Sequence, residues 1–130
     1  CFENLHNGED YVNPQNKVIK NELLTVATEP AKSYAYCADT AYYKPICEKI
    51  KGVDLLYHEA TYLDELEKKA GERFHSTSKQ AALIAKCAGA KRLLMGHFSS
   101  MYDSLEQFKE EGCEIFPNSE IAEEGTCYLA

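Results

Sequence analysis

The amino-acid sequence, 130 residues long, predicts an α/β fold, and three observations support this prediction. Short apolar stretches typical of buried strands alternate with helix-like stretches from about residue 33 onward. One of the helical stretches carries both a start signal and a stop signal. The length is that of one compact domain with a hydrophobic core of its own.

Residues 1–32 are polar and contain turn-forming pairs such as Asn7-Gly8 and Asn13-Pro14. A regular pattern of elements begins only after them, over residues 33–130. Within residues 1–32, only NELLTVAT (21–28) has the composition of a short strand.

The part from residue 33 onward is predicted to form alternating strands and helices. The predicted strands are SYAYCADT (33–40), VDLLYHEAT (53–61), KRLLMGHFS (91–99) and CEIFP (113–117), and GTCYLA (125–130) is expected to pair at an edge. The predicted helices are KPICEKIKG (44–52), STSKQAALIAKCAGA (76–90) and YDSLEQFKEEG (102–112), with a polar helix or turn at LDELEKKAG (63–71).

The stretch at 76–90 gives the clearest helix signal of the chain. Thr77 and Gln80 have the spacing of a capping box, and Gly89 stands where a helix terminator is expected. Its apolar residues recur on one face, as in a helix that packs on a core: Ala81, Ala82, Ile84, Ala85 and Ala88.

Composition argues against several classes of protein. The net charge of -7 disfavours unaided nucleic-acid binding, which usually relies on a basic surface. No apolar run approaches the length of a membrane helix, and no secretory leader is recognisable. The six cysteines show no C-x-x-C spacing, so we expect buried free thiols in a reducing compartment: Cys1, Cys37, Cys47, Cys87, Cys113 and Cys127.

Polar residues stand at comparable points of the predicted elements. Asp39 is at the end of the first strand of the folded part, the pair His58-Glu59 ends the second, and His97 ends the third. His75 immediately precedes the capped helix. Since chemistry in open α/β sheets gathers at the carboxyl ends of strands, we expect these side chains to share one site.

Each of these residues has a chemical and a structural interpretation. Asp39 and His97 are ligand types that suit zinc or manganese, but Asp39 could instead cap a helix and His97 could be a buried core histidine. A carboxylate at Glu59 could orient and charge His75 for general-acid catalysis, or remain a solvated charge.

Four motifs, in this order and spacing, resemble the C-terminal half of ribonuclease Z: SYAYCADTAYY, DLLYHEATY, FHSTSKQAALIA and LLMGHFSSMY. This family comprises tRNA 3′-processing endonucleases of the metallo-β-lactamase superfamily, and the similarity runs from about Leu23 to the last residue. The resemblance implies the C-terminal half of an αββα sandwich, with residues 1–32 as a connecting segment and residues 33–130 as the half-sandwich.

The resemblance also implies the metal-binding residues. Asp39 would bridge two metal ions, and His97 of the GHF motif would be a terminal ligand of one of them. Zinc is the expected metal, with manganese or magnesium as alternatives.

The same resemblance implies a role for the HEAT and HST motifs. His75 would act with Glu59 to protonate the departing oxygen of the phosphodiester, and His58 would brace the loop. Ser76 and Thr77 would cap the helix, with a weaker expectation that they contact the substrate phosphate.

The H-x-H-x-D-H cluster that supplies most metal ligands in this family is absent from the chain. We therefore expect the isolated chain to be inactive without the N-terminal half of the same protein, while the intact protein would be a cytoplasmic homodimer acting on tRNA precursors. Two alternatives remain: another phosphodiesterase of the superfamily, or a non-catalytic assembly fragment.

Overall fold

A computed structural model describes residues 2–26 and 30–130 of the chain. It divides into two compact units, Cys1–Ala31 and Lys32–Ala130. In the described residues, no helix combines the length and apolar character needed to cross a membrane.

The first unit contains a short helix and a hairpin. Helix α1 spans Phe2–His6, and β1 (Tyr11–Val12) pairs antiparallel with β2 (Val18–Ile19). The side chain of Asn13 closes the hairpin turn by accepting hydrogen bonds from two backbone N–H groups. The strand expected at 21–28 is wrong for the described part of that stretch, where Asn21–Leu23 form the 3-10 helix η1. Residues 27–28 lie outside the described residues.

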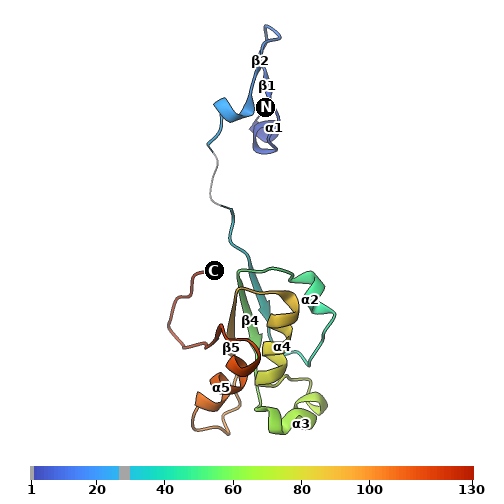
Figure 1. Cartoon of the computed structure of the whole chain (residues 1–130), viewed down its shortest axis with the longest axis vertical. Helices are drawn as coiled ribbons and strands as arrows, with labels where there is room; N and C mark the ends of the chain where they lie inside the picture. Colours follow the sequence, from blue (N-terminus) through green and yellow to red (C-terminus); the bar gives the residue numbers. More distant parts are fainter. Residues whose placement is uncertain (1, 27–29) are drawn as a thin grey trace. The chain divides into compact units, whose positions relative to one another are not determined.

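The second unit contains a four-stranded parallel sheet, which confirms the predicted α/β class (Figure 1). Its strands lie in the order β3 (Tyr34–Cys37), β4 (Leu55–Glu59), β5 (Arg92–Gly96) and β6 (Ser119–Ile121). The intervening helices are α2 (Ile46–Lys49), η2 (Asp64–Leu66), α3 (Glu67–Glu72), α4 (Ser78–Ala88) and α5 (Glu106–Ile115).

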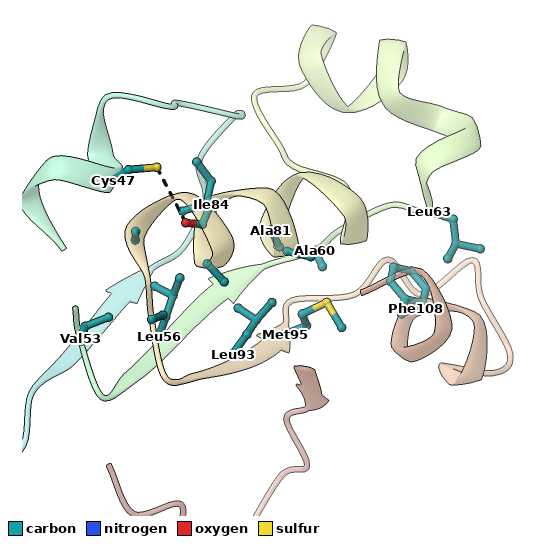
Figure 2. Packing of buried hydrophobic residues seen from close by; sticks show 14 residues of the cluster. Cys47, Val53, Leu56, Ala60, Leu63, Ala81, Ile84, Leu93, Met95 and Phe108 are labelled. Atoms are coloured by element: carbon teal, nitrogen blue, oxygen red, sulfur yellow. Dashed lines mark hydrogen bonds between the residues drawn. The ribbon is translucent and has the colours of Figure 1, made fainter. Parts of the chain in front are cut away.

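The core lies between one face of this sheet and the helices α2, α4 and α5 (Figure 2). Leu56 of β4 and Leu93 of β5 are fully buried there, in the same cluster as Ile84 of α4. Because successive residues of a strand point to opposite faces, Leu56 of β4 and Leu93 and Met95 of β5 share the face that packs in this cluster.

Tyrosines of β3 and β4 lie on the opposite face of the sheet. Tyr36 stacks on Tyr57 with ring centroids 4.7 Å apart. Tyr34 and Tyr36 remain 55% and 64% exposed, whereas Leu55 beside them is buried. This face therefore presents aromatic side chains to the outside of the unit.

The capping signals of α4 are confirmed. The Thr77 hydroxyl accepts a hydrogen bond from the N–H of Gln80, and the Gln80 side chain accepts one from the N–H of Thr77. Gly89 ends the helix with a φ of 64°, the left-handed conformation that glycine adopts without strain.

The C-terminal predictions need correction. The expected helix at 102–112 begins only at Glu106 and continues past Gly112 to Ile115, so the strand expected at 113–117 is wrong. The fourth strand is β6 instead, and residues 125–130 form no strand. Gly112 does not terminate α5. It lies within the helix, and its lack of a side chain lets α5 approach Met95 of β5.

The cysteines differ in their burial. Five lie in the described residues and all are free thiols, as predicted. Cys47 is buried, Cys37 and Cys113 are half-buried, and Cys87 and Cys127 are exposed, so the expectation of buried thiols was wrong for the last two. Cys1 lies outside the described residues.

We predict that Gly112→Ala destabilises the second unit by about 1–3 kcal/mol, because the added methyl group overpacks the core. Its Cβ would lie 2.6 Å from the Met95 Cε and 3.3 Å from the Ser119 Cβ. Urea unfolding followed by circular dichroism measures the change in the free energy of unfolding.

Gly71→Ala is the matched control, since it adds the same methyl group to helix α3 with no atom within 4 Å. Alanine is the better helix former, so this variant should be as stable as the parent chain or slightly more stable. Equal stability of Gly112→Ala and the parent would contradict the close approach of α5 to β5.

Candidate metal centre and proton-transfer site

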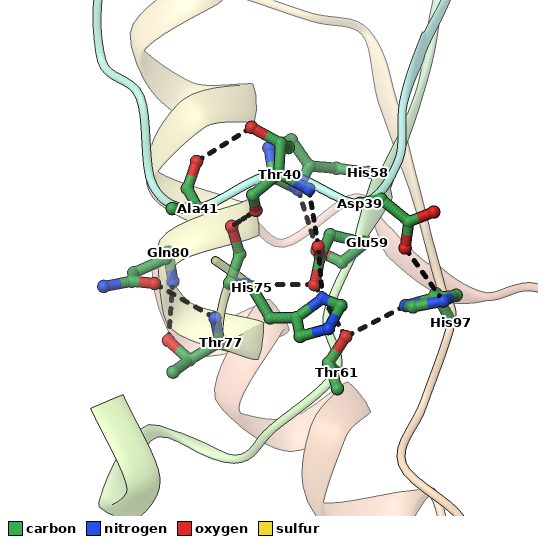
Figure 3. Close-up of polar contacts among 11 residues, drawn as sticks. Asp39, Thr40, Ala41, His58, Glu59, Thr61, His75, Thr77, Gln80 and His97 are labelled. Carbon is green, nitrogen blue, oxygen red and sulfur yellow. Dashed lines mark hydrogen bonds and ion pairs between the residues drawn. The ribbon is translucent and has the colours of Figure 1, made fainter. Parts of the chain in front are cut away.

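The structure brings the four predicted site residues together, as expected from the sequence (Figure 3). Asp39 follows β3, Glu59 ends β4, His97 follows β5 and His75 precedes α4. One ligand atom from each residue lies within 4.8 Å of the others. The carboxyl ends of parallel strands meet at one edge of the sheet, which explains why residues so distant in sequence converge.

Glu59 is at the centre of the site and is fully buried. Its Oε1 accepts hydrogen bonds from the Thr40 N–H (2.7 Å) and from His75 Nδ1 (2.9 Å). Its Oε2 accepts from the Ser76 N–H (2.9 Å) and from the Thr61 hydroxyl (2.7 Å). A carboxylate has about four acceptor positions, so all of them are occupied and none remains for a metal ion.

Two opposing effects determine the charge of Glu59. Burial raises its pKa, but the hydrogen bonds from Ser76, Thr61, His75 and Thr40 together outweigh burial and hold the pKa below its ordinary value. Glu59 is therefore ionised at neutral pH and holds His75 by a charge-assisted hydrogen bond.

His75 is oriented by both its ring and its backbone. Its Nδ1 donates to Glu59, and its backbone N–H donates to the Ala70 carbonyl at the end of α3. The side chain is 25% exposed, and Nε2 is not hydrogen-bonded to any described residue. The ring thus offers one nitrogen to a molecule entering the site.

Asp39 and His97 form the open side of the site. The Asp39 Oδ1 lies 3.1 Å from the His97 Nε2, and the two side chains are 74% and 44% exposed. Both residues have left-handed backbones, with φ of 47° and 61°, which cost about 1–3 kcal/mol each outside glycine. Strain of this kind is typical of residues whose position serves a function.

The donor set fits a metal ion. Asp39 and His97 offer a carboxylate oxygen and an imidazole nitrogen, the ligand types that zinc prefers along with thiolate. Neither is buried, so a cation can approach both from solvent. Because both oxygens of Glu59 already accept hydrogen bonds, we assign Glu59 to orienting His75 rather than to binding a metal ion.

His58 lies beneath the site and is almost completely buried. Its Nδ1 donates to the backbone carbonyl of Glu59 at 2.7 Å. Burial lowers the pKa of His58, so the ring is neutral at physiological pH. This contact supports the expectation that His58 braces the loop.

Ser76 and Thr77 are fully buried, and the protein itself uses their polar groups. The Ser76 hydroxyl donates to the Thr40 carbonyl at 2.7 Å, and the Thr77 hydroxyl donates to Asp64 while it caps α4. Their N–H groups are also occupied, by Glu59 and Gln80. Thr77 is therefore the capping residue, whereas the expected capping role of Ser76 is wrong because its groups bond to Thr40 and Glu59. We propose no phosphate contact for either residue.

Sequence reasoning missed two threonines of the site. The Thr40 N–H and carbonyl link the loop after β3 to Glu59 and Ser76, and the Thr61 hydroxyl contacts both Glu59 and His97. Thr61 stands two residues after Glu59, but only the structure brings it beside His97.

Residues 3–98 match the family described as the beta-lactamase superfamily domain. Two curated relatives are named Ribonuclease Z: that of Parabacteroides distasonis is 46% identical over 124 residues, and that of Bacteroides thetaiotaomicron is 45% identical over 123 residues. Each alignment covers 95% of this chain but only 41% and 39% of the relative, so the chain spans about two fifths of their length.

Solved structures show the same similarity. The metallo-beta-lactamase fold protein YhfI from Bacillus subtilis is 27% identical with a TM-score of 0.65, covering 70% of this chain and 37% of that protein. A long form RNase Z from yeast is also 27% identical with a TM-score of 0.59, covering 67% of this chain and 12% of the yeast protein. The resemblance seen in the motifs and the expected metallo-β-lactamase-type fold are thus confirmed.

We predict that Glu59→Gln lowers the free energy of unfolding by about 1–3 kcal/mol, because an amide NH₂ cannot accept from the donors that surround the carboxylate. The contribution of Glu59 is fully present above its unfolded pKa of about 4.5 and is lost as the pH falls through its lower folded pKa. The difference between the variant and the parent should therefore be largest near neutral pH and shrink below pH 4.5.

Denaturant unfolding between pH 3 and pH 7, a range about the carboxyl pKa, measures this difference. Glu110→Gln changes an exposed glutamate of α5 in the same way and should leave stability within about 0.5 kcal/mol. A pH-independent loss in Glu59→Gln would contradict an ionised Glu59.

Proposed function

Because the chain belongs to the beta-lactamase superfamily, we propose that it is the C-terminal part of a metal-dependent endoribonuclease that removes 3′ trailers from tRNA precursors. The relatives named Ribonuclease Z support this substrate, and the motifs HEAT, HST and GHFS support the same assignment. The whole protein would be larger than this chain, since those relatives are longer.

One observation carries the proposal: the hydrogen bond from His75 Nδ1 to the buried Glu59, next to Asp39 and His97. A carboxylate behind an imidazole fixes its tautomer and orients its other nitrogen for proton transfer. The imidazole faces the same opening as the two residues suited to a metal ion. One phosphodiester bound at this opening could therefore contact both His75 and the metal.

In the proposed reaction, water attacks phosphorus and loses one proton to solvent, and the bond from phosphorus to the 3′ oxygen of the tRNA breaks. His75 donates the proton on Nε2 to that oxygen, which leaves as a 3′-hydroxyl. Glu59 stabilises the charged imidazole before the transfer, and His58 holds the Glu59 backbone in place.

Asp39 and His97 would hold the metal, with Asp39 as the bridging ligand of two ions and His97 as a terminal ligand. We propose zinc, although manganese and magnesium suit a carboxylate-containing site as well. Bound metal ions supply Lewis acidity and an activated water in sites of this kind.

The proposal assigns two of the described residues, Asp39 and His97, to the metal, whereas catalytic zinc sites use three protein ligands. We propose that the remaining ligands come from the N-terminal half of the same protein, which would cover the exposed tyrosines of β3. The resemblance adds a cytoplasmic location and a homodimer to the proposal. Without that half, the isolated chain behaves as an inactive assembly fragment.

We predict that His75→Ala, in a full-length protein containing this chain, slows cleavage of a tRNA precursor by about 10²–10⁴-fold. Metal content should stay near that of the parent, because the proposal assigns His75 to proton transfer. Single-turnover cleavage and elemental analysis measure the two effects separately.

His6→Ala is the control, since His6 lies in α1 of the first unit. It should change neither rate nor metal content. Loss of metal in His75→Ala would show that His75 is a metal ligand and not the acid. Full activity on small phosphodiesters with poor activity on tRNA would favour another phosphodiesterase of the superfamily.

We also predict that the 130-residue chain retains little zinc after dialysis, since two protein ligands hold zinc weakly. Mixing it with the N-terminal half should raise the bound zinc towards that of the full-length protein. Isothermal titration with zinc measures the difference. Two tightly bound ions in the isolated chain would contradict the incomplete site.

A further inference from the structure

We propose that Thr61 is a positioning residue that fixes the tautomer of His97, so that Nε2 is the nitrogen presented to a cation. The Thr61 hydroxyl lies 2.7 Å from the Glu59 Oε2 and 3.0 Å from the His97 Nδ1. The inference rests on the proposed function only in treating His97 as a metal ligand. Figure 3 shows the hydroxyl between the two side chains.

The direction of each hydrogen bond follows from counting protons. A threonine hydroxyl has one proton to donate and can also accept. The remaining contacts of Glu59 include two backbone N–H groups, which can only donate, so the glutamate acts as an acceptor. The hydroxyl proton therefore points to Glu59, and the oxygen accepts from His97, whose proton is on Nδ1.

This arrangement leaves a lone pair on His97 Nε2, which faces the Asp39 Oδ1 at 3.1 Å. Two acceptors cannot hydrogen-bond to each other, so the lone pair of Nε2 is left available to a cation. Without Thr61, the better tautomer would carry its proton on Nε2 and donate it to Asp39. That proton would block the nitrogen that a metal ion needs.

Burial makes Thr61 the fixed member of the pair. Thr61 is 6% exposed, whereas the His97 side chain is 44% exposed. The Thr61 carbonyl also accepts from the Ser99 N–H at 3.0 Å, which ties the loop carrying His97 to the loop carrying Glu59. An exposed imidazole has few other constraints, so this buried hydroxyl decides which nitrogen faces outward.

The test is nitrogen-15 NMR of the histidine rings in the metal-free chain, at a pH where the rings are neutral. The chain has four histidines, so each ring can be assigned. We expect the parent and Thr61→Ser to carry the His97 proton on Nδ1, and Thr61→Val to carry it on Nε2. His58, whose Nδ1 donates to a carbonyl, should keep its tautomer in all three.

A proton on His97 Nε2 in the parent chain overturns the proposal without any variant, so it remains falsifiable if Thr61→Val fails to fold. An unchanged His97 tautomer in a folded Thr61→Val also overturns it. Thr61→Ala provides a second hydroxyl-free variant with the same expectation as Thr61→Val.

Metal affinity of the full-length protein supplies a second readout. Thr61→Val should weaken zinc binding by about 10–100-fold in competition with a chelator, and Thr61→Ser should restore it to within a few-fold. Equal zinc affinity in all three proteins overturns the proposal. Neither measurement depends on RNA cleavage, so the nuclease proposal could fail while the role of Thr61 stands.

Discussion

The buried carboxylate of Glu59 joins segments of the chain that are otherwise separate. Its two oxygens accept hydrogen bonds from the loop after β3, from the turn before α4 and from the residue two positions after itself. An ionised group can remain in a core only when its acceptor positions are satisfied. The loops that carry Asp39 and His75 are therefore anchored to one charge, and the site exists because that charge is fully hydrogen-bonded.

The same constraint separates the polar groups of the site into two kinds. Glu59, Thr61 and His58 are buried and fix the geometry, whereas Asp39 and His97 are exposed and face solvent. His75 stands between them, held by Glu59 on one nitrogen and open on the other. Rigid support beneath open ligands is the arrangement that metal and proton-transfer chemistry require.

The two faces of the sheet differ in how they are covered. Its helix-covered face forms a closed core, but the other face exposes tyrosines of β3 beside buried leucine. Asp39 and His97 supply two free donors at the edge where these faces meet. The proposed N-terminal half would cover this aromatic face and supply the remaining ligands.

The sequence alone determined the α/β class, the capped helix α4 and the convergence of Asp39, Glu59, His75 and His97, because strand patterns, capping boxes and strand ends are local signals. The last strand was misplaced because Gly112 resembles a helix terminator. In the structure it lies within α5, where the lack of a side chain lets the helix pack against Met95. Likewise, sequence reasoning assigned no role to Thr61, which meets His97 only across two strands. Tertiary structure decided those points, since a close helix approach and a hydroxyl shared between two loops depend on residues distant in the chain.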